Sequence, residues 1–218
     1  MEKKLSSLTL VLFLLPFMLG ATNSLLAQPP FQKLYGDAKP QGYSEVRVHD
    51  GAIYACGYLG ENPGILGVFS RFDINGNLQW TTMIEDTTVQ WLDFVPTKDN
   101  AFLVVGRSTP NGVPGGQQNN NLSVISKITD TGSVLWTRYY ENLGRESFSR
   151  VIRLTSVPSG TGEYYVLGVE NPNNSPSMTD RVVLYNFDIN GNIIWKKRLQ
   201  SGNDNEFVRG MLAVGPSS

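Results

Sequence analysis

The sequence is poor in the residues that build redox and metal chemistry, with one cysteine and one histidine in 218 residues. Because Cys56 is alone, the chain forms no internal disulfide and must be stabilised by packing. With only His49, a histidine-based zinc site cannot be assembled within one chain, and a Ser-His-Asp triad would have to recruit this same residue. We expect Cys56 to be a small buried hydrophobe and His49 to be a solvated turn residue. No cofactor and no metal ion are predicted.

An excess of charge of one sign is also missing, since 18 Lys and Arg stand against 19 Asp and Glu, for a formal net charge of −1. This balance predicts neither a nucleic-acid partner nor an anionic membrane partner. A Gly-rich phosphate loop, a GxSxG elbow and a basic stripe are absent as well. The common motifs of phosphate and acyl chemistry therefore give no lead to an activity.

Long apolar runs are limited to Val11–Leu19, near a short basic start, MEKK. A membrane span needs roughly 20 apolar residues, and Pro16 interrupts a run that is already too short. The pattern is typical of a secretory signal peptide, which we place at residues 1–27 with Ala27 as its last residue. The mature chain, residues 28–218, is then secreted, periplasmic or attached at the cell surface.

A sustained helical period is missing from the mature chain, and a nine-residue phrase is repeated instead. FDINGNLQW (72–80) returns as FDINGNIIW (187–195), with a looser copy, ITDTGSVLW (128–136), between them. The three tryptophans stand 56 and 59 residues apart, each four positions after a glycine. The resulting repeat residues are Gly76 and Trp80, Gly132 and Trp136, and Gly191 and Trp195. We interpret them as structural residues and the three phrases as copies of one unit.

Four short runs rich in β-branched and aromatic residues recur around each tryptophan. The predicted strands are 43–49, 52–58, 65–73 and 77–84; then 88–96, 101–107, 121–128 and 133–140; then 147–154, 163–170, 181–188 and 192–199. The fold class is therefore all-β, with three four-stranded antiparallel units of about 37–84, 85–140 and 141–200. The start of a fourth, incomplete unit is expected at 201–218.

The repeated phrase is predicted to be the hairpin between the third and fourth strands of each unit. Asn-Gly pairs at 75–76 and 190–191 lie between two β-type runs and favour a hairpin, because both residues tolerate positive φ. We expect the aspartates of the phrase, Asp73, Asp130 and Asp188, to accept hydrogen bonds from turn amides. A calcium loop is disfavoured because the glycine comes fourth in DINGN, whereas an EF-hand places it sixth.

Units of this kind resemble the blades of a β-propeller. In particular, residues 136–151, 162–168 and 184–195 resemble a repeat of secreted and cell-surface bacterial proteins with the pattern D-x-x-G-x-x-x-W, which is distantly similar to quinoprotein propellers. The resemblance covers residues 31–213, with Thr131-Gly132 as a degenerate copy. It implies a partial β-propeller of three complete blades and the start of a fourth, which would leave inter-blade faces uncovered.

Acidic residues recur in the steps that lead into each first strand, and a propeller would gather them at one mouth. The candidate binding residues are Asp37, Asp86, Glu146, Asp204 and Glu206. They would form a cation or polyol site, or paired carboxylates for glycoside cleavage; the other interpretation is that they cap turns and are solvated.

Two functional hypotheses follow. The first is a non-enzymatic, exported propeller that gives a binding or scaffold surface outside the cytoplasm. Its partners would be a protein or glycan at the cell surface, and further blades would come from a longer chain or from self-association. The second is a propeller enzyme, either a quinone-dependent oxidoreductase or a glycan-acting hydrolase or lyase, with its site at the blade mouth. Fold alone does not decide between them, and the absence of distinctive site residues favours the first.

Overall fold

The structure is a computed structural model that describes residues 41–61, 64–84, 88–109, 122–140, 145–157, 162–171, 181–199 and 211. All of these residues belong to one compact unit, Tyr35–Ser218. The predicted signal peptide lies outside the described residues, and so does the predicted fourth unit apart from Met211.

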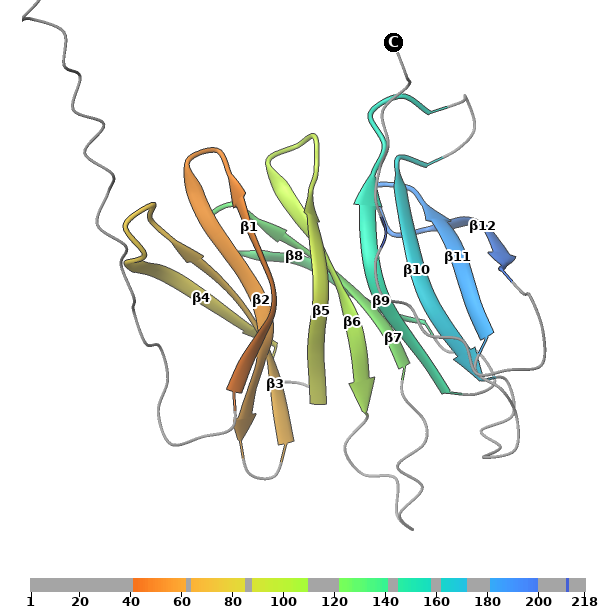
Figure 1. The fold of residues 1–218 in the computed structure, drawn as a ribbon, viewed down its shortest axis with the longest axis horizontal. Helices are drawn as coiled ribbons and strands as arrows, with labels where there is room; N and C mark the ends of the chain where they lie inside the picture. Colours follow the sequence, from red (N-terminus) through yellow and green to blue (C-terminus); the bar gives the residue numbers. More distant parts are fainter. Residues whose placement is uncertain are drawn as a thin grey trace, which may run out of the picture. The chain divides into compact units, whose positions relative to one another are not determined.

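The described residues form three four-stranded antiparallel sheets and no helix (Figure 1). Sheet A contains β1 (Gln41–His49), β2 (Ala52–Glu61), β3 (Gly64–Phe72) and β4 (Leu78–Ile84). Sheet B contains β5 (Thr88–Pro96), β6 (Ala101–Thr109), β7 (Leu122–Thr129) and β8 (Val134–Tyr140). Sheet C contains β9 (Arg145–Arg153), β10 (Tyr164–Asn171), β11 (Arg181–Phe187) and β12 (Ile193–Arg198). The all-β prediction and the three four-stranded antiparallel units are confirmed.

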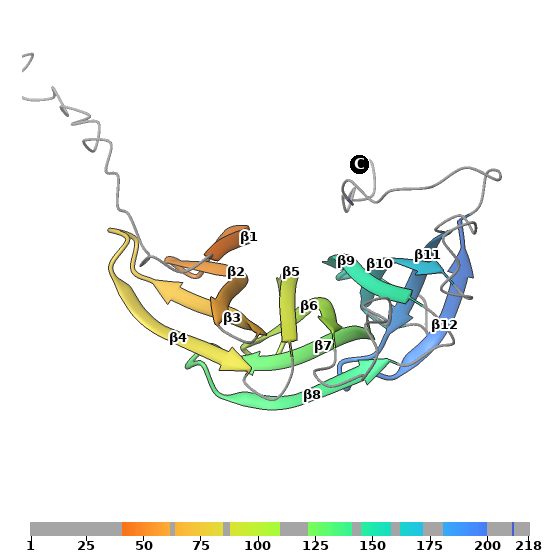
Figure 2. The same cartoon turned by 90° about the horizontal axis from the view of Figure 1, so that it is seen from below.

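The three sheets have the same strand order and the same positions of irregular strand pairing. In each sheet the strands follow the order of the sequence, and the first strands β1, β5 and β9 lie at one edge while β4, β8 and β12 lie at the other (Figure 2). Each first strand has an irregularity in its pairing with the second strand, and each third strand has one next to the tryptophan of the fourth. The repeated glycine of the second strand fits the first irregularity, because a Cβ at Gly106 would lie 2.1 Å from the carbonyl oxygen of Gln90.

Sheet B is buried on both faces, and β6 shows how its sequence permits this. Phe102 and Val104 pack into a cluster with residues of sheet A, whereas Leu103 and Val105 pack into a cluster with residues of sheet C. Because successive side chains of a strand point to opposite faces, an uninterrupted apolar run serves both clusters. The sheets therefore stack in the order A, B, C, each burying apolar side chains against the next.

The predicted hairpins between third and fourth strands are present in all three sheets. Gly76, Gly132 and Gly191 take φ of 75°, 90° and 77°, whereas Asn75 and Asn190 keep negative φ. The amides of the glycines bond back to carbonyls three residues earlier, so each turn has positive φ at the glycine only. Of each Asn-Gly pair, the glycine is the residue that takes positive φ, and the aspartate three residues before it bonds across the turn.

In the middle hairpin, the side chain that accepts from the turn amide is not the predicted Asp130. Asp73 Oδ1 accepts from the amide of Asn77 at 2.7 Å, and Asp188 Oδ1 accepts from the amide of Asn192 at 2.8 Å. In sheet B the equivalent acceptor is Thr129 Oγ1, bonded to the Ser133 amide at 2.9 Å. The acceptor must stand three residues before the glycine, a position that Thr129 occupies, so Asp130 does not cap this turn.

The repeated tryptophan contacts the repeated glycine of the next sheet. A Cβ at Gly132 would lie 3.1 Å from the Trp80 ring, and a Cβ at Gly191 would lie 2.8 Å from the Trp136 ring. A hydrogen bond supports each contact, from Thr82 Oγ1 to the Gly132 carbonyl at 2.5 Å and from Tyr140 Oη to the Gly191 carbonyl at 2.6 Å. The nine-residue repeat of one sheet therefore packs against the same repeat in the next sheet.

Candidate functional site

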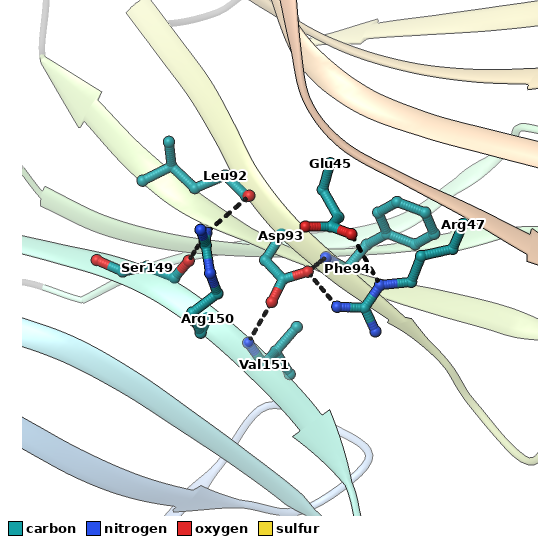
Figure 3. Close-up of polar contacts among 8 residues, drawn as sticks. All are labelled: Glu45, Arg47, Leu92, Asp93, Phe94, Ser149, Arg150 and Val151. Atoms are coloured by element: carbon teal, nitrogen blue, oxygen red, sulfur yellow. Dashed lines mark hydrogen bonds and ion pairs between the residues drawn. The ribbon is translucent and has the colours of Figure 1, made fainter. Parts of the chain in front are cut away.

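A charged network joins the first strands of the three sheets (Figure 3). Its centre is Asp93 on β5, whose side chain is 1% exposed. Asp93 Oδ1 accepts from Arg47 Nη2 of β1 at 2.6 Å, and Oδ2 accepts from the Val151 amide of β9 at 2.8 Å. A third bond, from the Phe94 amide at 2.8 Å, fixes the carboxylate on its own strand. One carboxylate therefore connects sheets A, B and C.

The environment of Asp93 is that of a structural group. Burial raises the pKa of its carboxyl, while the Val151 amide, Arg47 and the Phe94 amide oppose the rise. With both oxygens occupied by hydrogen-bond donors, the carboxylate has little capacity left to accept a proton from a substrate. The network therefore has a structural role and holds the three sheets together.

Arg150 occupies on β9 the register position that Asp93 occupies on β5, because each pairs with the equivalent residue of its second strand. Its guanidinium donates to the carbonyl oxygens of Ser149 at 2.8 Å and Leu92 at 3.5 Å (Figure 3). A cation at this position thus also connects sheet C to sheet B.

Cys56 lies close to this network but is enclosed in the cluster between sheets A and B, with 0% exposure. Burial raises the pKa of the thiol well above its ordinary value, and the nearby Asp93 and Glu45 raise it further. A protonated, enclosed thiol is a poor nucleophile, so the prediction of a small buried hydrophobe is confirmed.

A cavity of 180 Å³ lies at the hairpin end of sheets A and B, and we call it the A–B cleft. Its charged and amide side chains come from three hairpin turns and from β3: Asp50, Asn100, Asp130 and Arg71. Rings of Tyr54, Phe102 and His49 form the remaining wall, with the Tyr54 and Phe102 centroids 4.4 Å apart.

His49 belongs to this wall and is less solvated than the sequence predicted. It ends β1, its ring contacts the Phe102 ring edge-on with centroids 5.6 Å apart, and its side chain is 36% exposed. The Nε2 atom lies 3.4 Å from Asp50 Oδ2. The turn itself is formed by the next two residues, Asp50 and Gly51, both with positive φ.

Arg71 is the cation of the A–B cleft. Its Nε is buried and has no hydrogen-bond partner, and its guanidinium carbon lies 5.8 Å from the centroid of the Tyr54 ring. Burial raises the pKa of Tyr54; Arg71 opposes this rise, and Asp130 and Asp50 add to it. The same cleft therefore holds one guanidinium and two carboxylates within electrostatic reach of one phenol.

At the junction between sheets B and C, the position equivalent to Arg71 holds a cation that is bound in an ion pair. Lys127 stands on β7 where Arg71 stands on β3, because Lys127 pairs with Trp136 as Arg71 pairs with Trp80. Lys127 Nζ lies 2.6 Å from Asp99 Oδ2, and its side chain is 7% exposed. This ion pair lowers the pKa of Asp99 despite the opposing effect of burial. Asp99, which closes the B–C junction, aligns in the sequence with Asp50 of sheet A, whose side chain is 83% exposed.

Most of the acidic residues that the sequence analysis gives as candidate binding residues lie outside the described residues. Asp37, Asp86, Asp204 and Glu206 are outside the described residues, and of Glu146 only the backbone is described, paired with Glu170 in sheet C. The residues of the A–B cleft were not predicted as a site. Comparing the third strands of the three units would have pointed to it, since the position reads Arg71, Lys127 and Asn186.

Within the described ranges, no group of three or more His, Cys, Asp or Glu side chains is arranged to hold a metal ion. The same part of the chain contains no helix of sufficient length and apolarity to span a membrane. No protein-family model matches the chain, and no curated protein matches it either. The likeness to propeller repeats therefore stays a prediction.

Proposed function

We propose that the chain is an exported, non-enzymatic β-propeller repeat protein that gives a binding or scaffold surface outside the cytoplasm. The observation that carries this proposal is the repeated contact between sheets: the tryptophan of one unit meets the turn glycine of the next at both junctions. Units that stack by one rule form a rigid platform, on which hairpins and loops are free to vary.

The propeller arrangement is supported by the first strands. Propeller blades are four-stranded sheets arranged radially, so their first strands lie near a common axis. Here β5 contacts both β1 and β9, and Asp93 binds residues of both. Contacts among the first strands, with a network that joins them, support a radial arrangement.

The non-enzymatic character is supported by how buried charges are used. Among the described residues the buried charged side chains are Asp93, Lys127 and Glu170. Each has an oppositely charged partner: Arg47 at 2.6 Å, Asp99 at 2.6 Å and Lys196 at 2.8 Å, respectively. Catalytic acids and bases need an accessible group with a tuned pKa, whereas these groups are committed to pairs.

Two measurements on the full chain test the proposal. Expression in a bacterial host followed by cell fractionation and mass spectrometry should find the protein outside the cytoplasm with Gln28 as its first residue. The purified mature protein, supplied with quinone and a redox dye, should not reduce the dye on alcohols or sugars, and it should not cleave chromogenic glycosides. Retention in the cytoplasm with the N-terminal segment intact, or turnover in either assay, would contradict the proposal.

A further inference from the structure

The Nε atom of Arg71 is buried and lacks a hydrogen-bond partner, which is unusual for a charged group. Buried polar atoms are nearly always hydrogen-bonded, and an unsatisfied buried donor is costly. Among the buried side-chain atoms of the described residues that lack a partner, Arg71 Nε is the one that carries a formal charge, and Arg71 lines the A–B cleft. At the matched B–C position the cation is satisfied by Asp99. The two junctions are thus built alike, and only one of them leaves its cation open to the cavity.

The A–B cleft contains both hydrogen-bond donors and acceptors. Arg71 offers N–H donors, while Asp50 and Asp130 offer carboxylate oxygens, and Asn100 offers both an amide donor and a carbonyl. Asp50 is 83% exposed, so it stands at the solvent side of the cleft. The backbone fixes this arrangement, because the Asp130 amide donates to the Asn100 carbonyl at 3.2 Å and thereby joins two turns of sheet B.

The charged side chains that line the A–B cleft disfavour the binding of simple ions. The lining carries one guanidinium and two carboxylates. A small inorganic anion would bind Arg71 but would be repelled by Asp50 and Asp130, and a cation would be repelled by Arg71. A zwitterion would satisfy the signs, but exposed ion pairs with groups such as Asp50 are weak in water.

We propose that the A–B cleft binds a small, neutral, polyhydroxylated ligand of the sugar class. Each hydroxyl is both a donor and an acceptor, so adjacent hydroxyls satisfy Arg71 on one side and a carboxylate on the other. The rings of Tyr54, Phe102 and His49 supply an apolar wall for the C–H face of such a ligand. A volume of 180 Å³ suits one small ligand or one unit of a longer glycan. The inference rests on the proposed function, since an exported protein meets glycans.

The test is a titration of the full mature chain with glucose, galactose and mannose, followed by saturation-transfer NMR. Sulfate and glycine serve as the anion and zwitterion probes. At least one sugar should bind saturably, and Arg71→Gln and Asp130→Asn should each weaken its binding about tenfold, because each removes one hydrogen bond to a charged group. Thermal unfolding of each variant shows whether it is folded, and Arg71→Gln should remain so, since Arg71 Nε makes no hydrogen bond, although the substitution removes a contact with the Tyr54 ring.

Lys127→Gln is the matched control, because it removes the equivalent cation from the closed B–C junction. It should lower the thermal stability and leave sugar binding within about twofold of the parent chain. Three results would overturn the proposal: no saturable binding of any of the sugars, binding of sulfate or glycine that depends on Arg71, or an equal loss of sugar binding in Lys127→Gln. If sugars do not bind while the protein is exported and without turnover, this inference fails and the proposed function stands.

Discussion

The contact between Trp136 and Gly191 shows how a single residue type is required at each side of a junction. The Trp136 ring packs with the cluster between sheets B and C, and its edge meets the turn of sheet C. We expect Trp136→Ala to lower the free energy of unfolding by up to about 3 kcal/mol, the lower end of the cost of removing a fully buried aromatic, because the ring is only partly buried. Urea unfolding measures it. An unchanged stability would show that the ring does not hold the junction.

The glycine partner gives a sharper test, because two glycines share a backbone conformation and differ in their surroundings. Gly191 has φ of 77° with Trp136 2.8 Å from a would-be Cβ, whereas Gly51 has φ of 72° and nothing within 4 Å. Gly51→Ala should cost about 1–2 kcal/mol, from the left-handed conformation alone. Gly191→Ala should cost more than this, because the ring must also move. Equal losses in urea unfolding would mean that the contact contributes nothing.

At the scale of the element, the first strands depend on the carboxylate of Asp93. In Asp93→Asn one carboxylate oxygen is replaced by an NH2 group, which is a donor. This group then faces another donor, either the Val151 amide or Arg47. We expect a loss of about 1.5–3 kcal/mol in the free energy of unfolding, the range for hydrogen bonds to charged groups. Glu45→Gln is the control, since Glu45 lies 3.5 Å from Arg47 Nε and is 28% exposed. A larger loss in Glu45→Gln than in Asp93→Asn would reverse our assignment of the network's centre.

Sheet C depends in the same way on Glu170, and here the dependence is visible in pH. Glu170 accepts from Tyr185 Oη at 2.6 Å and from Lys196 Nζ at 2.8 Å. Burial raises the pKa of this carboxyl, but the bonds from Lys196 and Tyr185 prevail and lower it. A lowered pKa means that the stabilisation is complete above the unfolded pKa of about 4.3 and is lost as pH falls through the folded pKa.

The corresponding measurement compares the parent chain with Glu170→Gln by urea unfolding at pH 7 and at successively lower pH. The parent should be more stable by about 1.5–3 kcal/mol at pH 7, and the difference should shrink as the carboxylate is protonated. Taking the difference also cancels Asp93, whose raised pKa acts in the opposite direction. A gap between the two proteins that stays constant down to low pH would show that the charge of Glu170 is not what stabilises the sheet.

Much of this element-level architecture could be predicted from sequence, because it is encoded locally. The twelve runs of β-type residues correspond to the twelve strands of the described residues, with ends that agree within three residues. The capping position was harder, since Thr129 and Asp130 are both capable acceptors and only the register of the turn separates them. The A–B cleft was not predicted, because Arg71 and Asn100 come from different units and meet only when the sheets stack.

At the scale of the whole molecule, the stacking rule applies to sheet faces that have no described sheet against them. On sheet B the positions that face sheet C, such as Leu103 and Val105, are buried. Their counterparts on sheet C, Tyr165 and Leu167, are only partly buried. On the opposite face of sheet A, apolar side chains are exposed, among them Val46 at 55% and Val48 at 66%. These two faces are the equivalents of the two that meet at each observed junction.

We therefore expect copies of the chain to associate head to tail, with the outer face of sheet A of one copy against the outer face of sheet C of another. Light scattering should give a mass above the monomer value at micromolar concentration, and dilution should lower it. Val46→Asp should shift the protein to the monomer with little loss of stability, because Val46 is 55% exposed. Ile74→Asp is the matched control: this residue is 50% exposed but lies on a hairpin turn, so the mass should not change. A parent chain that is monomeric throughout, or equal dissociation by both substitutions, would contradict association through the sheet faces.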